Sequence, residues 1–449
     1  MYHHNTADPR ARQGHYRPSG RRAAEIAADV EAAVAAGRAG PGTVLPPVRA
    51  LAAELGLATG TVAAAYRLLS DRGIVEGRTR SGTVVRARPG AASRRLDAVA
   101  PGMCDLATGN PDPALLADLD RVLGVVASRP RPVGLYGGPA VNPDLAERAR
   151  RLFADDGISL PSVTVMGGAL DAIERALEVH VRPGMRVAVE DPGYAGALDL
   201  IAAMGLVPEP VALDDEGMDP DSLAAALRRG AQAVILTPRA QNPTGAALTE
   251  DRARALRPLL HGVMVIEDDH AGAVAGAPAV TVTGGHAGPA VVVRSCSKVL
   301  GPDLRVALVV GDAATVEAME ARRSVGAGWV SHVLQELVVE ALNDVTTSWA
   351  GAAARYRERR DALVGALAAA GVAARGRSGL NVWVPVPEEG QVVAGMAARG
   401  WAVAPGARYR IASPPAVRVT VSTLGPQTAE RVANDLAATL AGADGTRAS

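Results

Sequence analysis

Apolar residues recur at helical spacing in three segments near the start of the chain. The first spans residues 21–36, and the second opens with a Pro-Pro pair at 46–47 and closes at Gly56. A third segment follows a short turn and has Thr59 or Thr61 as its candidate N-cap. The pattern predicts three helices, of which the last two are joined by a short turn.

Two short apolar runs at 74–76 and 83–85 lie on either side of a basic turn and predict a β-hairpin. Two helices joined by a short turn and followed by a hairpin are typical of a winged helix-turn-helix. We therefore predict a DNA-binding domain at residues 14–88. Residues 89–104 lack periodicity and predict a linker.

Beyond this linker, short apolar runs rich in β-branched residues alternate with segments of helical spacing. Parallel strands need long crossover connections, usually helices, so the alternation, which starts near Cys104, predicts an α/β domain with a mainly parallel sheet. We expect its strands at 163–165, 186–189, 233–236, 263–266, 291–293 and 307–310.

Charge and cysteine content change this picture only locally. The chain has 47 basic and 47 acidic residues, so its net charge indicates neither nucleic acid nor a membrane as partner. Residues 1–88, however, hold 13 arginines against 7 acidic residues. The two cysteines, Cys104 and Cys296, give no disulfide framework, which suits a reducing compartment. The sequence also has no apolar run of membrane length, so we expect a cytoplasmic protein. The short His3-His4 tract predicts no metal site.

Lys298 is the only lysine of the chain, and every other basic side chain among the 47 is arginine. A lysine amine can lose its proton and attack a carbonyl, which a guanidinium cannot do. Lys298 follows the expected strand at 291–293, and Ser295 and Arg305 are near enough in sequence to hold a phosphate. These residues predict an amine that reacts with a cofactor aldehyde. The alternative is that drift toward arginine left one lysine by chance.

Polar residues follow other expected strands, and ligands of open α/β sheets bind beyond the carboxyl ends of the strands. Gly168 and Ala169 precede a helix whose N-terminus could cradle a phosphate. Tyr194 could stack on a ring, Asn242 could donate to a ring oxygen, and Asp268 could hold a proton on a pyridine nitrogen. Each feature alone is also explained by packing or by a solvated loop, so only the combination indicates a cofactor site.

The combination resembles a known family. Asn-Pro-Thr-Gly at 242–245, a strand-end aspartate, and Ser-x-Ser-Lys with an arginine seven residues later are similar to the aminotransferase fold that binds pyridoxal 5′-phosphate (PLP). The resemblance covers residues 105–443 and implies an aminotransferase-like domain there, with a mainly parallel central sheet and a smaller C-terminal α+β subdomain. It also implies Lys298 as the catalytic Schiff-base lysine, Asp268 on the pyridine nitrogen, Asn242 on the ring oxygen and Tyr194 stacked on the ring.

The same resemblance assigns the remaining contacts. Ser295 and Arg305 would hold the phosphate together with the backbone at 168–169. Tyr136 matches a tyrosine that reaches the phosphate of a neighbouring subunit, which implies a homodimer. Arg418 matches the arginine that pairs with the carboxylate of an amino compound.

His270 departs from the family, which usually has a tyrosine bonded to the ring oxygen at this position. An imidazole donates only in one tautomer or when protonated, and its charge varies near neutral pH. We therefore expect His270 to retune the pKa of the Schiff base and to slow catalysis. The alternative is that His270 packs behind the ring and contacts nothing that titrates.

The N-terminal module resembles the DNA-binding domain of GntR regulators, in Leu-Pro-Pro-Val-Arg-Ala-Leu-Ala at 45–52 and in the wing at 80–83. The order of the two modules looks like the MocR subgroup, whose aminotransferase-like domain senses PLP or an amino compound. This resemblance implies that five side chains face operator DNA: Arg49, Thr61, Arg67, Arg78 and Arg80. The start of the third helix lacks the basic residues common in that family.

Two functions follow. The chain is either a transcriptional regulator whose second domain binds PLP, or a PLP-dependent aminotransferase acting on an amino acid, with a fused or vestigial winged helix. Module order and the local excess of arginine favour regulation. A scaffold without a cofactor fits poorly, because the only lysine lies in the cofactor motif.

Overall fold

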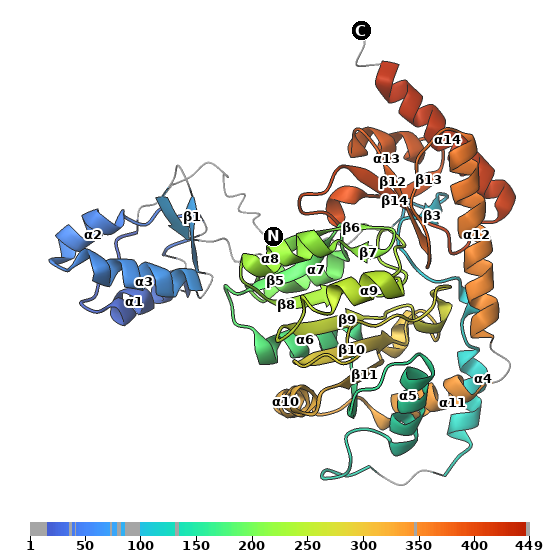
Figure 1. Ribbon diagram of the computed structural model, residues 1–449, viewed down its shortest axis with the longest axis horizontal. Coiled ribbons are helices and arrows are strands. Elements are labelled where there is room, and N and C mark those ends of the chain that lie inside the picture. Colours follow the sequence, from blue (N-terminus) through green and yellow to red (C-terminus); the bar gives the residue numbers. More distant parts are fainter. Residues whose placement is uncertain are drawn as a thin grey trace, which may run out of the picture. The chain divides into compact units, whose positions relative to one another are not determined.

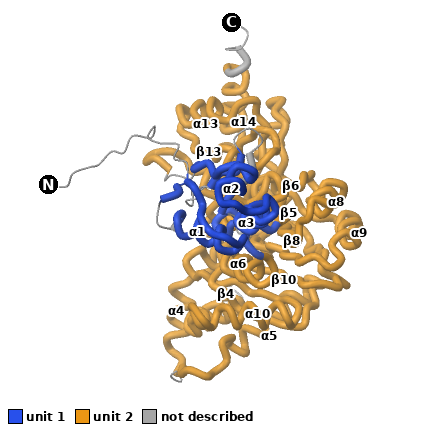
Figure 2. Tube along the Cα trace, turned by 90° about the vertical axis from the view of Figure 1, so that its left-hand side faces the viewer, with its two compact units in different colours: residues 1–93, 182–185, 201–207 blue, residues 94–181, 186–200, 208–449 orange. Residues whose placement is uncertain are grey.

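The computed structural model describes residues 16–35, 38–40, 42–71, 74–78, 82–85, 99–130, 134–344 and 348–445 (Figure 1). The chain divides into two compact units (Figure 2). Unit 1 comprises residues 1–93 with the short segments 182–185 and 201–207, and unit 2 comprises the remainder. Most of the expected linker, residues 89–98, and Arg80 lie outside the described residues, so the domain boundaries stay predictions.

The N-terminal module has the elements that the apolar pattern predicts. They are α1 (Ala23–Ala35), α2 (Val48–Leu55), α3 (Thr59–Asp71), β1 (Val75–Arg78) and β2 (Gly82–Val85). The three helices form because their apolar stripes share one core, which buries Ile26, Leu51 and Leu69. Gly56 closes α2 in the left-handed region at φ 66°, where glycine carries no Cβ penalty. The two strands pair in antiparallel register, with Val75 opposite Val85.

The central sheet of unit 2 has eight strands in the order β4-β11-β10-β9-β8-β5-β6-β7. Strands β5, β8, β9 and β10 run parallel, whereas β11 is antiparallel to both β10 and β4. All six predicted strands are present in this sheet. The bounds are β4 (Ser162–Met166), β5 (Arg186–Asp191), β6 (Val207–Asp214), β7 (Gly217–Met218), β8 (Ala231–Leu236), β9 (Met264–Asp268), β10 (Ala290–Ser295) and β11 (Ala307–Gly311).

Strands β9 and β10 are buried along their whole length, as expected where helices cover both faces of a parallel sheet.

Eleven described helices follow the N-terminal module, and none of the described helices is long and apolar enough to cross a membrane. They are α4 (Leu119–Ala127), α5 (Pro143–Asp155), α6 (Ala169–His180), α7 (Ala195–Ala203), α8 (Pro220–Arg228), α9 (Glu250–Leu256), α10 (Ala313–Ser324), α11 (His332–Asn343), α12 (Trp349–Ala369), α13 (Glu389–Ala397) and α14 (Pro426–Gly445). Short 3-10 turns occur at 113–115, 272–274, 302–304 and 406–408.

A second sheet of four strands forms the smaller subdomain, in the order β12-β14-β13-β3. Its bounds are β12 (Asn381–Pro385), β13 (Trp401–Pro405), β14 (Ala416–Thr420) and β3 (Cys104–Leu106). The long helices α12 and α14 lie side by side next to this sheet and close its core (Figure 1). Strand β3 pairs in parallel with β13, so a strand that begins at the last residue of the expected linker joins the C-terminal sheet.

Candidate functional site

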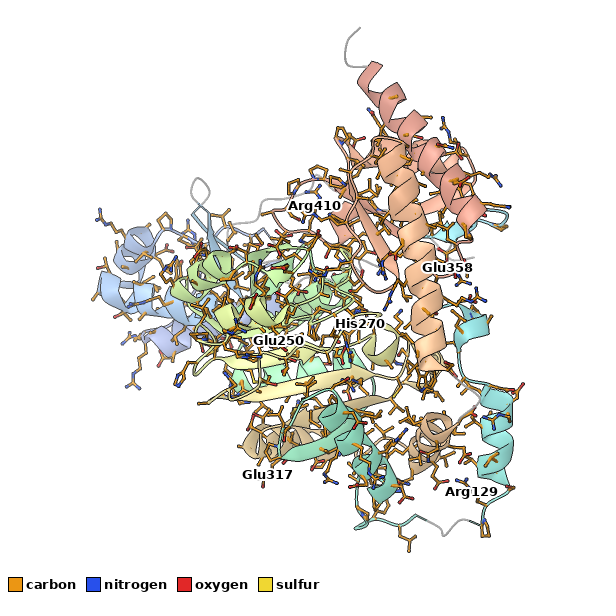
Figure 3. The ribbon with its side chains drawn as sticks, turned by 45° about the vertical axis from the view of Figure 1, so that its right-hand side comes forward. Arg129, Glu250, His270, Glu317, Glu358 and Arg410 are labelled. Atoms are coloured by element: carbon orange, nitrogen blue, oxygen red, sulfur yellow. The ribbon has the colours of Figure 1, made fainter. Side chains whose placement is uncertain are left out.

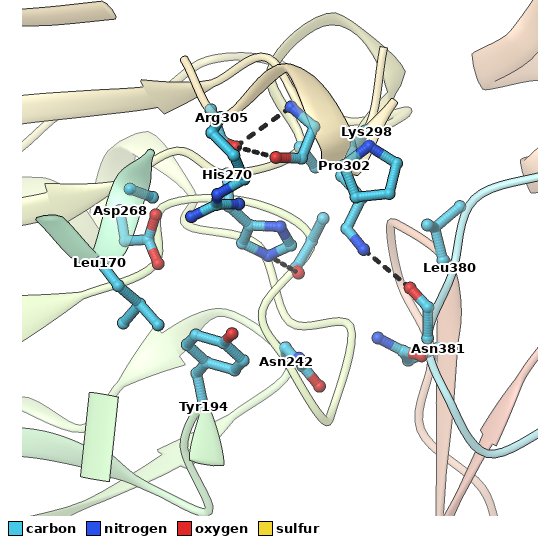
Figure 4. Close-up of a pocket in the computed structure, with 16 residues that line it drawn as sticks. Leu170, Tyr194, Asn242, Asp268, His270, Lys298, Pro302, Arg305, Leu380 and Asn381 are labelled. Carbon is cyan, nitrogen blue, oxygen red and sulfur yellow. Dashed lines mark hydrogen bonds between the residues drawn. The ribbon is translucent and has the colours of Figure 1, made fainter. Parts of the chain in front are cut away.

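A cavity of about 230 Å³ lies beyond the carboxyl ends of the parallel strands (Figure 4). The structure brings most of the sequence-predicted residues together there: Ala169, Tyr194, Asn242, Asp268, His270, Ser295, Lys298 and Arg305. Gly168, Arg418 and Tyr136 are not among the lining residues. Gly168 is the N-cap of α6 beside the cavity, and Arg418 is buried and bonded to the lining residue Asn242.

The amine of Lys298 is held by the backbone. Lys298 Nζ donates to the carbonyl oxygen of Gly109 at 2.7 Å. Burial and the charge of Arg418 lower the pKa of the Lys298 amine to about 8. Burial disfavours the charged form of an amine, so a substantial fraction of Lys298 is neutral, and therefore nucleophilic, near physiological pH.

Asp268 ends β9 with an unsatisfied oxygen. The residue is 4 % exposed, and its Oδ1 has no hydrogen-bond partner. Burial, followed by the charges of Asp269 and Glu190, raises the pKa of Asp268 to about 7. A buried carboxylate without a donor is costly, and a ligand that carries a protonated ring nitrogen would remove that cost.

Two carboxylates near Asp268, Glu190 and Asp269, are satisfied from within the protein. Glu190 accepts hydrogen bonds from Thr237 and Gln241, and its pKa is raised to about 7 by burial. Asp269 forms ion pairs with Arg239 and Arg294. Burial acts to raise the pKa of Asp269, but the hydrogen bond from Arg239 and the charge of Arg294 lower it below its usual range. Of these three carboxylates, Asp268 is the one that lines the cavity and has an oxygen without a donor, so it is the one that a ligand can reach.

Donors and a helix N-terminus gather at one end of the cavity. Gly168, at φ 109°, caps α6, and a Cβ at this position would overlap the guanidinium of Arg305. Ser295 Oγ donates to Ser297 Oγ at 3.1 Å and accepts from the backbone N–H of Ser297. A guanidinium, hydroxyls and the positive end of a helix dipole form an anion site, so these residues fit a phosphate.

Arg418 is already engaged. Its Nη1 donates to Asn242 Oδ1 at 3.0 Å, and its Nη2 donates to the carbonyl oxygen of Ala107. The guanidinium also lies over the ring of Tyr409, 4.9 Å from the centroid. Because Asn242 accepts from Arg418 through its oxygen, the amide nitrogen of Asn242 remains for donation to a ligand.

His270 corrects one expectation from the sequence. Its Nε2 lies 2.9 Å from the carbonyl oxygen of Ala240, which can only accept, so Nε2 carries the proton. Burial and the charge of Lys298 lower the pKa of His270 to about 4. The charge of His270 therefore does not vary near neutral pH, and its other nitrogen, Nδ1, can only accept a hydrogen bond.

The carbonyl that fixes this tautomer belongs to a residue with unusual backbone geometry. Ala240 has φ 54°, which costs a non-glycine residue about 1–2 kcal/mol. Its N–H is held by Ser378 Oγ at 2.8 Å, and Gly379 packs against its Cβ. His270 itself is half-buried and lines the cavity, just before the 3-10 turn at 272–274 that packs against α12 (labelled in Figure 3).

Tyr136 is 92 % exposed and meets Trp329 edge to face, with ring centroids 5.7 Å apart. The structure thus places Tyr136 outside the cavity of its own chain.

In the N-terminal module, Arg49 and Arg67 are exposed and form no ion pair among the described residues, while Thr61 lies in the first turn of α3. Arg78 ends β1, and Arg80 lies outside the described residues.

Sequence reasoning missed three backbone contributors: the carbonyls of Ala107, Gly109 and Ala240. A carbonyl carries no residue-specific signal. The Gly-Asn-Pro-Asp turn at 109–112 is the one available hint, because it places a glycine where the chain approaches other groups closely.

Family comparisons agree with this geometry. Residues 101–436 match the family described as aminotransferase class I and II, and residues 22–85 match the gntR family of bacterial regulatory proteins. The chain belongs to the MocR-type GntR regulators. Its first module is a helix-turn-helix of DNA-binding type, and the cofactor of its second module is PLP.

Relatives of this MocR-type chain include transcriptional regulators. It is 38 % identical to the vitamin B6 salvage pathway transcriptional repressor PtsJ of Salmonella typhimurium, over 93 % of this chain and 98 % of that protein. It is 29 % identical to the transcriptional regulator TauR of Rhodobacter capsulatus, over 79 % and 82 %. Among solved structures, the α-aminoadipate aminotransferase LysN of Thermus thermophilus matches with a TM-score of 0.69 at 23 % identity, over 79 % of this chain and 97 % of that chain. This last match shows the fold alone.

Proposed function

We propose that this regulator binds PLP covalently through Lys298 and that occupancy of this site controls its binding to operator DNA. The carrying observation is the pairing of the only lysine, with its lowered pKa, and the unsatisfied carboxylate of Asp268 in one cavity. Both are in a chain that also has a GntR module.

The residues of the cavity take separate roles in this proposal. PLP, when bound, supplies an aldehyde that a primary amine can attack. Lys298 offers the amine, and burial keeps part of it neutral. Asp268 holds a proton on the ring nitrogen, and Tyr194 and Asn242 position the ring. Arg305 and Ser295, with the backbone at 168–169, hold the phosphate.

A vitamin B6 compound is the effector that the relatives favour. PtsJ is named for vitamin B6 salvage, and the pyridoxine biosynthesis regulator PdxR of Corynebacterium glutamicum is 27 % identical over 55 % of this chain. Arg418 supports an amino compound as a second effector, because a carboxylate could replace its contacts to Asn242 and Ala107.

A homodimer is the assembly that the surface supports. Five exposed apolar side chains lie on two chain segments near Tyr136: Leu135, Tyr136, Val325, Trp329 and Val333. Exposed apolar side chains gathered in this way mark protein interaction sites. In a dimer, Tyr136 would reach the phosphate of the partner. Sedimentation of the PLP-loaded protein should give a dimer, and a stable loaded monomer would contradict this.

The aminotransferase alternative keeps one supporting observation: Lys298, Asp268 and Arg418 all lie at one site. We expect any turnover to be slow, because His270 cannot donate to the ring oxygen from Nδ1.

One experiment tests the regulator against the enzyme. The purified full-length protein is titrated with PLP and followed by near-visible absorbance, then footprinted on DNA upstream of its own gene and its neighbours, with and without PLP. We expect an absorbance band, paired protected half-sites and a change of affinity with PLP. Absence of protection at low salt, together with keto-acid product from amino acids, would favour the enzyme.

A further inference from the structure

The segment 107–109 connects the smaller subdomain to the cofactor cavity. It directly follows β3, whose Cys104 N–H donates to Gly400 O at 2.8 Å and whose Leu106 is fully buried. After the segment, Asp112 is anchored again, because its N–H donates to the Tyr356 hydroxyl and its carboxylate pairs with Arg359 at 2.8 Å. The segment is thus a short bridge between two fixed points.

Two cations of the cavity region hold this bridge by its carbonyls. Lys298 Nζ donates to Gly109 O, and Arg418 Nη2 donates to Ala107 O (Figure 4 shows the lysine contact). Asp105 shapes the same turn by accepting from the N–H groups of Ala107 and Thr108. Gly109 has φ 74°, and a Cβ there would lie 3.1 Å from Arg418 Nη2, so the segment and the guanidinium are in close contact.

Covalent attachment of PLP must change the lysine contact. When Lys298 Nζ condenses with the aldehyde, a C=N bond forms, the aldehyde oxygen leaves as water, and the nitrogen keeps at most one proton. A charged amine has three N–H donors, but the condensed nitrogen has one or none. The C=N bond also fixes its direction toward the cofactor, so Gly109 O loses its charged donor.

We propose that Lys298 holds the segment 107–109 in the PLP-free protein and that covalent attachment of PLP releases it, so that β3 reports cofactor attachment toward the DNA-binding module. The inference rests on the proposed covalent attachment at Lys298. Among the described residues, β3 is the next strand or helix along the chain after the winged helix.

Hydrogen exchange of the full-length protein tests the release. Amides of the peptide that spans residues 105–112 should exchange roughly tenfold faster with attached PLP than without it, which corresponds to the loss of one charge-assisted hydrogen bond. Lys298→Arg keeps a cation but cannot condense, so added PLP should not change its exchange. Lys298→Met lacks the donor, and its exchange should be fast without PLP.

Glycine variants give a second test that leaves Lys298 intact. In Gly109→Ala, the Cβ would crowd Arg418 and strain the backbone, so the segment should exchange fast and the DNA affinity should shift in the same direction as with PLP. Gly102→Ala is the matched control, because Gly102 also has positive φ (85°) but no atom within 4 Å of an added Cβ. Gly102→Ala carries the same kind of backbone strain without crowding Arg418, so its exchange at 105–112 and its DNA affinity should be those of the wild type.

The outcomes separate this inference from the proposed function. Attached PLP with unchanged exchange at 105–112 would overturn the release, while the proposed function would stand. Fast exchange in Gly109→Ala without any change in DNA affinity would overturn the report to the DNA-binding module. Absence of covalent attachment would overturn the proposed function itself, together with the inference that rests on it.

Discussion

The cofactor cavity and the DNA-binding module place their charged side chains in opposite environments. At the cavity, Lys298 is half-buried and hydrogen-bonded, the neighbouring Arg418 is buried and hydrogen-bonded, and Asp268 is buried without a donor on Oδ1. In the module, Arg49 and Arg67 are exposed to solvent. A buried charge needs a partner, so the missing partner indicates the chemistry of the ligand. A solvated charge is already satisfied by water. The exposed arginines of the module therefore say much less about which DNA sequence it binds than the buried charges of the cavity say about its ligand.

The largest expected effect is on covalent PLP attachment in the cavity, after substitution of Lys298. Lys298→Arg should abolish covalent attachment of PLP, because a guanidinium does not form an imine. Borohydride treatment should fix PLP to the peptide that contains Lys298 in the wild type and to no peptide in the variant. An unchanged absorbance spectrum in Lys298→Arg would contradict the assignment.

The second-largest effect is expected on PLP affinity when the carboxylate of Asp268 is removed. Asp268→Asn should weaken PLP binding by about 100-fold or more, since the ring nitrogen would lose a buried charged partner. Glu267→Gln is the matched control on the same strand, where neighbouring side chains point to opposite faces. Glu267 does not line the cavity, and its Oε1 accepts from Thr281 and from backbone N–H groups while its buried Oε2 has no partner, so its substitution should leave PLP affinity unchanged. Equal loss in both variants would indicate general destabilisation.

The pH dependence of PLP attachment tests whether the cavity lowers the pKa of the Lys298 amine. Burial lowers the pKa of Lys298 to about 8, so the neutral amine dominates above that pH and becomes scarce below it. The attachment rate should fall by about tenfold for each pH unit below 8 and should level off above it. Stopped-flow absorbance measures this profile. A rate that keeps rising up to pH 10 would mean that the amine has the ordinary pKa of an exposed lysine.

A smaller effect is expected on operator binding when the exposed arginines of the DNA-binding module are substituted. Arg67→Ala and Arg49→Ala should each weaken operator binding by about tenfold, and a lost phosphate contact should lower the slope of log affinity against log salt by about 1. Binding of a labelled operator at several salt concentrations gives both numbers. The exposed Arg355 of α12, in the other unit, is the control position and should have no effect. An unchanged affinity in both module variants would mean that these arginines are merely solvated.

The same contrast explains what the sequence could predict. The strands ending near Asn242, Asp268 and Lys298 were predictable, because apolar runs mark buried strands and reactive residues follow them. The pairing of β3 with β13 was not, because a parallel contact between residues far apart in sequence has no local signal. The tautomer of His270 depends on a carbonyl at Ala240 whose direction is set by a left-handed backbone, and side-chain identity does not reveal that.

His270 gives the smallest and most discriminating prediction. In the structure its Nε2 donates to Ala240 and its pKa is about 4, so the imidazole should show no titration between pH 6 and 8. A tyrosine at this position has a hydroxyl that can donate to an anionic ring oxygen. That bond stabilises the deprotonated chromophore, so His270→Tyr should lower its apparent pKa by about one unit, roughly the free energy of one hydrogen bond.

Spectra of PLP-loaded wild type, His270→Tyr and His270→Phe, recorded across pH, measure this shift. Phenylalanine removes both nitrogens and serves as the control, because it fills the position without donating or accepting. The tyrosine variant should also transaminate at least as fast as the wild type, since a neutral imine nitrogen can take the proton of an incoming ammonium and so free the amine for attack. If all three proteins titrate alike, His270 packs behind the ring without acting on the chromophore. The departure from the family would then be one of packing, and the low turnover expected of this site would need another cause.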